Sequence, residues 1–184
     1  MAFDSVFPVA LDFNLRVLRM LGDPSGDESL EKTAYHESGH AVCATLGGGI
    51  ILNATLEPDS SSSRRRSGEV SIGWGASIPI ETRLLSILAG PVAEMIYSGD
   101  PLHPGLVAEW TDDWEQAWEL AGHRHAEPIK RLRYLEQLTA KLYLRMKRDD
   151  LWAAIASVAD LLLAHDSIEH DALEYEVSQW IEHW

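Results

Sequence analysis

The chain has 184 residues, of which 46% are hydrophobic and 24% charged, and its formal net charge is −14 at pH 7. This length predicts one domain with at most a small appendage, and the apolar content is enough for a sizeable core. The strongly negative charge argues against nucleic acid or an anionic membrane as the main partner. Because Cys43 is the only cysteine, the chain cannot form an internal disulfide.

The first predicted element is a helix over residues 9–21, which has helix-like apolar spacing. It ends at a cluster of Gly, Asp, Pro and Ser over residues 22–26. We expect no signal peptide before it, since residues 1–8 contain an acidic residue and no basic one. We therefore expect a helical extension over residues 1–26, separate from the domain that follows.

The next predicted helix begins at Asp27 or Ser29, which can cap it, and runs to Leu46, where three glycines follow. Two β segments come after it, at residues 50–56 and 68–74, with a polar loop rich in serine and arginine between them. They predict a hairpin or a small sheet close to this helix.

Helices dominate the rest of the sequence. An apolar stripe predicts a helix from Pro79 that ends at the Ser-Gly-Asp-Pro run beginning at Ser98. Thr111 is expected to cap a further helix, and Pro128 to open another. Residues 151–164 and 168–181 complete an antiparallel helical set. The predicted fold class is α+β, mainly α, with the small sheet next to the helix that ends at Leu46.

Residues 36–40 read His-Glu-Ser-Gly-His, a complete HExxH pattern. Residues four apart lie on one face of a helix, so His36 and His40 can bind the same ion. Glu37 could take a proton from water and pass it to a leaving amine, a pairing typical of zinc hydrolases. A chance match on a polar surface is the alternative. The small apolar residues around the motif favour a metal site, because a buried His-Glu-His cluster is otherwise costly.

Catalytic zinc commonly has three protein ligands and one open position, so a third ligand must be found. The metzincin extension of the motif is absent, because Cys43 stands at its glycine position and Leu46 at its third histidine. Composition does not separate the remaining candidates, which are Glu94, His103, Asp112, Asp113 and Glu115.

Residues 34–42 read AYHESGHAV and resemble the peptidase domain of FtsH-type membrane-anchored AAA metalloproteases, whose motif helix reads AYHEAGHAV. The resemblance continues in residues 88–99, which are similar to that family's LLGGRAAE…FG helix. Residues 113–117 resemble its NDLERA segment, and residues 151–177 resemble its C-terminal helical hairpin.

The resemblance implies that residues 27–184 form an FtsH-like peptidase domain. It implies one zinc ion per chain, bound by His36, His40 and Asp113, with Glu37 as the catalytic base. The chain departs from the family in three places. It has no GxxxxGK[ST] pattern, and Asp112 stands where the family has Asn. The family's Gly-Arg pair is Gly90-Pro91 in this chain. Dependence on ATP is therefore not implied.

From these features we expect a zinc-dependent metalloendopeptidase that hydrolyses unfolded or flexible polypeptides and does not itself use ATP. Residues 68–74 could present a strand edge to an extended peptide, or could equally be plain sheet core. The alternative function is an inactive zinc-binding scaffold or regulator derived from such a peptidase. A third reading is a helical interaction module in which the HExxH pattern is accidental.

We expect a cytoplasmic location and no membrane insertion by this chain, because the longest apolar stretch, residues 151–164, is interrupted by Asp160 and is too short to span a bilayer. The expected partner is a polypeptide substrate rather than nucleic acid. The chain could also form a homo-oligomer or work with a separate partner protein.

Overall fold

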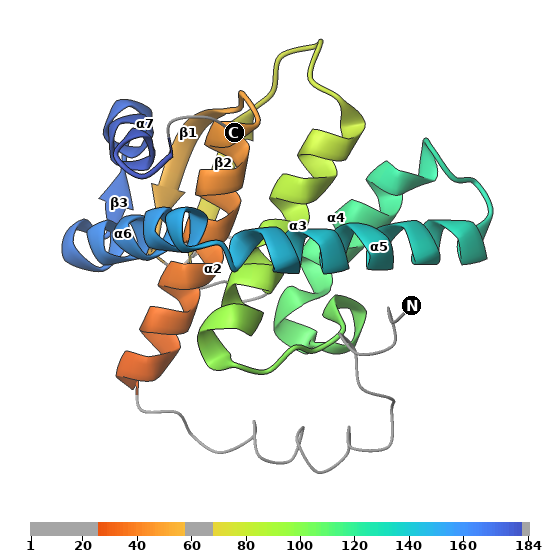
Figure 1. The fold of residues 1–184 in the computed structure, drawn as a ribbon, viewed down its shortest axis with the longest axis horizontal. Coiled ribbons are helices and arrows are strands. Elements are labelled where there is room, and N and C mark those ends of the chain that lie inside the picture. Colours follow the sequence, from red (N-terminus) through yellow and green to blue (C-terminus); the bar gives the residue numbers. More distant parts are fainter. Residues whose placement is uncertain (1–25, 58–67, 182–184) are drawn as a thin grey trace.

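The computed structural model describes residues 26–57 and 68–181 (Figure 1). The helix predicted over residues 9–21, the rest of the extension up to residue 25, and the serine-rich loop at residues 60–67 lie outside the described residues. The described chain is mostly helical and contains a small three-stranded antiparallel sheet. The predicted α+β class, mainly α, is therefore confirmed.

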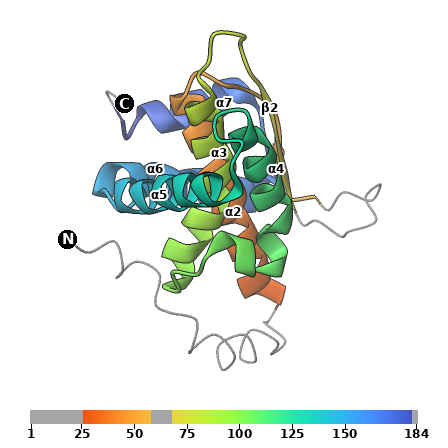
Figure 2. The same cartoon turned by 90° about the vertical axis from the view of Figure 1, so that its right-hand side faces the viewer.

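Two helices, α2 (Gly26–Leu46) and α3 (Ile80–Ser98), lie side by side at the centre of the molecule. Figure 2 shows that α5 and α6 cross one side of this pair, whereas β2 and α4 lie on the opposite side. The remaining elements are β1 (Ile50–Thr55), β2 (Glu69–Gly73), two short 3-10 helices (Pro104–Leu106 and Ala108–Trp110), α4 (Thr111–Gly122), α5 (Pro128–Met146), α6 (Asp149–His165), β3 (Ser167–Ile168) and α7 (His170–Ser178).

Helix α2 ends at Leu46 as predicted. The amide of Gly49 donates to the carbonyl of Ala44 over 2.8 Å, and Gly48 has a φ of 78°, a left-handed conformation that suits glycine. The predicted start was wrong, because α2 already begins at Gly26 and both Asp27 and Ser29 lie inside it. Several residues in this segment are able to cap a helix, so the sequence alone does not show where the helix begins.

The sheet has the order β2-β1-β3, with β1 antiparallel to both neighbours. The β1–β2 pairing confirms the predicted hairpin, in which Ile51 lies opposite Ile72 and Ala54 opposite Val70. Strand β3 was not predicted, because it consists of only two residues. Since β2 pairs with β1 alone, it is an edge strand within the described part of the sheet.

The helical stripe predicted after Pro79 is confirmed, since Leu84, Leu88 and Val92 on α3 are fully buried. The helix ends at Gly99, which has a φ of 74°. Helix α5 begins at Pro128, as predicted. The predicted N-cap at Thr111 was wrong, because this residue is already helical and its hydroxyl donates to the carbonyl of Ala108.

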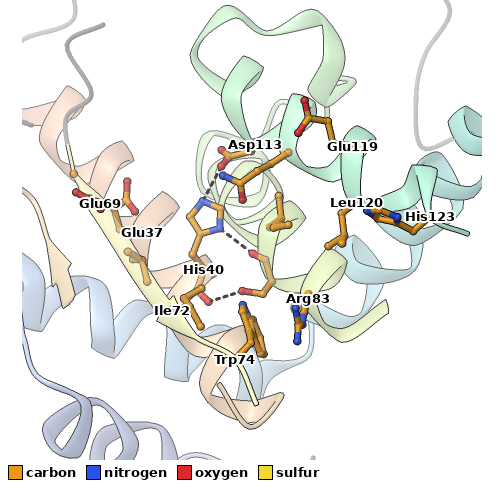
Figure 3. A pocket seen from close by; sticks show the side chains of 15 residues that line it. Glu37, His40, Glu69, Ile72, Trp74, Arg83, Asp113, Glu119, Leu120 and His123 are labelled. Atoms are coloured by element: carbon orange, nitrogen blue, oxygen red, sulfur yellow. Dashed lines mark hydrogen bonds and ion pairs between the residues drawn. The ribbon is translucent and has the colours of Figure 1, made fainter. Parts of the chain in front are cut away.

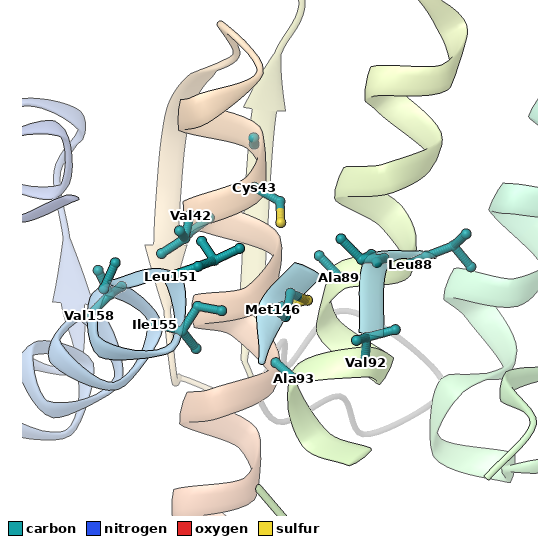
Figure 4. Close-up of a cluster of buried hydrophobic side chains, with 14 of the residues drawn as sticks. Val42, Cys43, Leu88, Ala89, Val92, Ala93, Met146, Leu151, Ile155 and Val158 are labelled. Carbon is teal, nitrogen blue, oxygen red and sulfur yellow. The ribbon is translucent and has the colours of Figure 1, made fainter. Parts of the chain in front are cut away.

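The core gathers where α2, α3, α5 and α6 meet (Figure 4). Val42 and Cys43 of α2 face Met146, Leu151 and Ile155 in this cluster, and all five are buried. Burial raises the pKa of the Cys43 thiol to about 12, so it is a neutral core side chain. None of the helices in the described residues has both the length and the apolar character needed to cross a bilayer.

The backbones of α2 and α3 touch at Gly39. A Cβ atom there would lie 2.4 Å from the carbonyl oxygen of Ala89 and 2.8 Å from the Cβ of Ala93. Both distances are shorter than van der Waals contact, so only glycine permits this crossing. Because His40 is the next residue, the crossing also sets how far the motif helix lies from α3.

We predict that Gly39→Ala lowers the free energy of unfolding by about 1–3 kcal/mol, because overpacking at the crossing outweighs the gain in helix propensity. Gly122→Ala is the matched control, since a Cβ there would meet only the guanidinium end of the Arg131 side chain, at 3.1 Å. Its stability should stay within about 1 kcal/mol of the wild type. Urea denaturation of both variants checks the prediction, and equal stabilities would contradict it.

Candidate metal centre

Helix α2 places the two motif histidines one turn apart on the same face. Their Nε2 atoms converge to 3.0 Å, and the rings meet edge to face with centroids 4.7 Å apart. His40 is buried and His36 is partly buried. The four-residue spacing in the sequence therefore produces the paired nitrogens that it predicts.

Asp113 reaches the same point from the first turn of α4. Its Oδ2 lies 3.0 Å from His36 Nε2, and its Oδ1 lies 3.5 Å from His40 Nε2. The Asp113 side chain is buried, and its position at the start of a helix favours the ionised form of the carboxyl group. The structure thus brings together three side chains that are up to 77 residues apart in sequence.

The three side chains have the spacing of a metal-binding group. One candidate ligand atom from each of His36, His40 and Asp113 lies within 4.8 Å of the others. A tetrahedral zinc ion with bonds of about 2.0–2.2 Å separates neighbouring ligand atoms by about 3.3 Å. The two histidine nitrogens are 3.0 Å apart, and each lies 3.0–3.5 Å from one oxygen of Asp113, Oδ2 for His36 and Oδ1 for His40, which is close to that value. Two imidazoles and one carboxylate are also a donor set that zinc accepts.

Each histidine is held from its other ring nitrogen. His40 Nδ1 donates to the backbone carbonyl of Ser86 over 2.8 Å, which leaves Nε2 as the ring nitrogen that can bind a metal. His36 Nδ1 lies 3.2 Å from Glu94 Oε2, and the buried indole of Trp110 donates to that same oxygen over 2.6 Å. Such partners fix the ring orientation and the basicity of metal-ligating histidines.

Glu94 was one of the candidates for the third ligand, and its place in the structure gives it a different role. It contacts the Nδ1 side of His36, whereas Asp113 contacts the Nε2 side. His103 instead lies 3.6 Å from Glu136 and against the ring of Trp114. Asp112 and Glu115 are on α4 but outside the group of three.

Gly90 on α3 leaves room beside the converging nitrogens. A Cβ atom at this position would lie 2.2 Å from His40 Nε2 and 2.7 Å from His36 Nε2. Any side chain here would therefore displace the imidazoles. Pro91, which follows Gly90, is one of the chain's departures from the FtsH-type pattern. It lies inside α3 and does not end the helix.

Glu37 is buried next to this group and lines the same cleft as His40 and Asp113. Gly68, the residue before β2, covers it: a Cβ atom on Gly68 would lie 2.8 Å from Glu37 Cγ and 2.9 Å from its Oε1. Gly68 has a φ of 89°, so both its backbone conformation and its surroundings require glycine. The carboxylate is thus held between α2 and the edge strand.

Carboxylates set the charge of the centre. Burial alone lowers the pKa of His36, but its hydrogen bonds with Asp113 and Glu94 outweigh this and raise that pKa to about 10. Burial opposes ionisation of Asp113, yet the neighbouring His40 and His36 hold its pKa far below the usual range. With Glu37 nearby, three acidic side chains surround two imidazoles, which favours a bound cation.

A cleft of about 550 Å³ opens beside these residues (Figure 3). Strand β2 with Ile72, and Trp74 just after the strand, form one wall, and α4 forms the other, with Asp113 and Leu120. The floor comes from α2 and α3. The edge strand and the candidate metal centre therefore share one cavity.

No model of a known protein family matches the chain, and no curated protein matches it. The resemblance to FtsH-type peptidases thus depends on the motifs alone, and the geometry of the site carries the functional argument.

Several residues that shape the centre were not found from the sequence. Ser86 acts through its backbone carbonyl, so the identity of its side chain gives no signal. Trp110 lies in a short 3-10 helix and is one of seven tryptophans. Gly68 and Gly90 could have been noticed as isolated glycines inside predicted elements, which often mark a close approach of the backbone.

We predict that Asp113→Asn weakens zinc binding by more than about 100-fold, because loss of a direct ligand should exceed the usual effect of losing an outer partner. Asp112→Asn, one residue away, is the matched control and should bind zinc like the wild type. Competition with a chromogenic chelator measures both affinities. Equal affinities for the two variants would remove Asp113 from the ligand set.

We predict a smaller loss for Glu94→Gln, of about 10–100-fold in zinc affinity, because this variant retains the three ligands and weakens only the support of His36. The same competition assay applies, with circular dichroism to verify folding. A loss larger than that of Asp113→Asn would make Glu94 the third ligand instead.

Proposed function

We propose that this chain is a zinc metalloendopeptidase that hydrolyses peptide bonds in unfolded or flexible polypeptides and does not itself require ATP. The observation that carries the proposal is the convergence of ligand atoms from His36, His40 and Asp113. Two of these residues, His40 and Asp113, line a cleft that Glu37 also lines. Glu37 is not one of the three ligands, and a site that only binds metal does not require a general base. The resemblance to FtsH-type peptidases supports the same reading.

In the proposed mechanism, His36, His40 and Asp113 hold the metal, and zinc when bound supplies a Lewis acid for the peptide carbonyl and for water. The Glu37 carboxylate takes a proton from the attacking water. It then passes that proton to the leaving amide nitrogen as the C–N bond breaks, giving a carboxylic acid and an amine. The outer contacts of the histidines keep the ligands in place during these steps.

The edge strand β2 suggests how a substrate is held. It lines the cleft and pairs with β1 on one side only, within the described sheet. An extended peptide can add to such an edge through backbone hydrogen bonds, which depend little on sequence. Most of the extended backbone of a folded protein is already paired within its own sheets, so we propose unfolded or flexible polypeptides as the substrate. The cytoplasmic location stays a prediction.

We predict that Glu37→Gln retains zinc but reduces hydrolysis by at least about 100-fold, because it keeps the size of the side chain and removes the base. Casein and a library of unfolded peptides are the substrates, with zinc-loaded wild type, the variant and a chelated control assayed in parallel. ATP should have no effect on turnover.

Two outcomes would contradict this proposal. Negligible turnover in all three samples would favour the inactive zinc-binding scaffold. Turnover that strictly requires ATP would mean that a separate motor protein takes part.

A further inference from the structure

The cleft extends past the candidate metal centre to Arg83, next to Trp74 (Figure 3). One face of α3 carries Arg83, Ser86 and Gly90, because these residues are three and four positions apart. Gly90 adjoins the converging histidine nitrogens. At roughly 1.5 Å per residue, the backbone of Arg83 lies about 10 Å along the helix from Gly90.

The guanidinium of Arg83 is fixed in position by its surroundings. Its Nη2 donates to the backbone carbonyl of Gly75 over 3.1 Å, and its Cζ lies 6.0 Å from the ring centroid of Trp74. These contacts use one nitrogen and the flat face of the group. They leave the buried Nε–H of Arg83 without an acceptor among the described residues.

Arg83 also has no acidic partner within the described part of the chain, where none of its interactions is an ion pair with a carboxylate. Among the described residues that line the cleft, it is the only arginine or lysine. The Asp and Glu residues among those that line the cleft are Glu37, Glu69, Asp113 and Glu119. An arginine that is held in place and has donors to spare matches the planar, two-oxygen shape of a carboxylate.

We propose that Arg83 binds a carboxylate of the substrate and so selects polypeptides that carry an acidic group about three residues from the bond that is cut. An extended peptide advances about 3.3 Å per residue, so three residues span the distance along α3 from the metal centre to Arg83. The carboxylate is either an Asp or Glu side chain or the C-terminus of the polypeptide. This proposal rests on the proposed function, because it names the substrate of the same cleft.

The first test starts from a peptide that the wild type cuts. In a series of variants of this peptide, a single Asp is placed at each position in turn on both sides of the cleaved bond. A matching series with Asn in place of Asp is the neutral control. The same peptide is made with a free or an amidated C-terminus. At one position of the carboxylate, we expect kcat/KM to be about tenfold higher than for the matching neutral peptide. This is the usual size of the effect of a hydrogen bond to a charged group. The preference should weaken as salt is raised.

Substitution of Arg83 should change this preference in a defined way. Arg83→Glu should favour Lys at the position where the wild type favours Asp, and Arg83→Gln should show no preference. Lys141→Glu is the matched control, because it makes the same change of charge at an exposed position on α5 outside the cleft. It should keep the wild-type preference.

A second measurement separates this proposal from the peptidase activity itself. Binding of fluorescent acidic and neutral peptides is measured by anisotropy to zinc-loaded Glu37→Gln protein, with Arg83 intact or replaced by Gln. Tighter binding of the acidic peptide only when Arg83 is intact supports the proposal, even if the wild type cuts nothing. Equal binding of acidic and neutral peptides to the protein with Arg83 intact would overturn the proposal. It would also be overturned if wild type and Arg83→Glu ranked the Asp, Asn and Lys peptides in the same order of kcat/KM.

Discussion

The backbone contact between α2 and α3 is the constraint on which the candidate site depends. At Gly39 the two helices are so close that a single Cβ atom would collide with the α3 backbone at Ala89. This spacing lets His40 reach the carbonyl of Ser86, which holds the imidazole with Nε2 toward the cleft. Gly90 then leaves the space beside that nitrogen open. Packing of the core and orientation of the ligands are therefore set by the same contact.

A second constraint is the burial of charge. Glu37, His40 and Asp113 are all less than 10% exposed, although burying such groups is costly unless they are paired. Asp113 is paired with both imidazoles, and Glu94 is held by His36 and Trp110. The neighbouring imidazoles lower the pKa of Asp113 and so keep its carboxylate ionised where a cation could bind. Such a cluster contributes less to stability than an apolar core of the same volume. Its burial therefore indicates a functional role and not a stabilising one.

The fold was predictable where the signal was local. The apolar stripe of α3, the proline that opens α5 and the two strands separated by a polar loop were recognised from periodicity and turn residues. The same holds for the paired histidines, because a spacing of four residues determines their common face. Helix starts were less certain, as at Asp27 and Thr111, since several neighbouring residues are able to cap. Strand β3 is defined by its pairing with β1, and two residues carry no periodicity.

The third member of the metal group was beyond the reach of spacing alone. Asp113 meets His36 only because α4 packs against α3, and from composition it was equivalent to Asp112, Glu115 and Glu94. The resemblance to a known peptidase motif singled it out, and the structure supplies the distances. Contacts made by the backbone, such as the carbonyl of Ser86, leave no trace in the sequence and require coordinates.

The central claim is that His36, His40 and Asp113 form one zinc site. X-ray absorption at the zinc edge tests it most directly on zinc-loaded protein. If the three residues bind zinc, the spectrum should show two imidazole nitrogens and further oxygen ligands at about 2.0–2.2 Å, with no sulfur. Asp113→Asn should alter this spectrum, and Asp112→Asn should leave it unchanged. A sulfur ligand at about 2.3 Å, which only Cys43 or a methionine could provide, or a spectrum without imidazole would mean that these three residues do not form the zinc site.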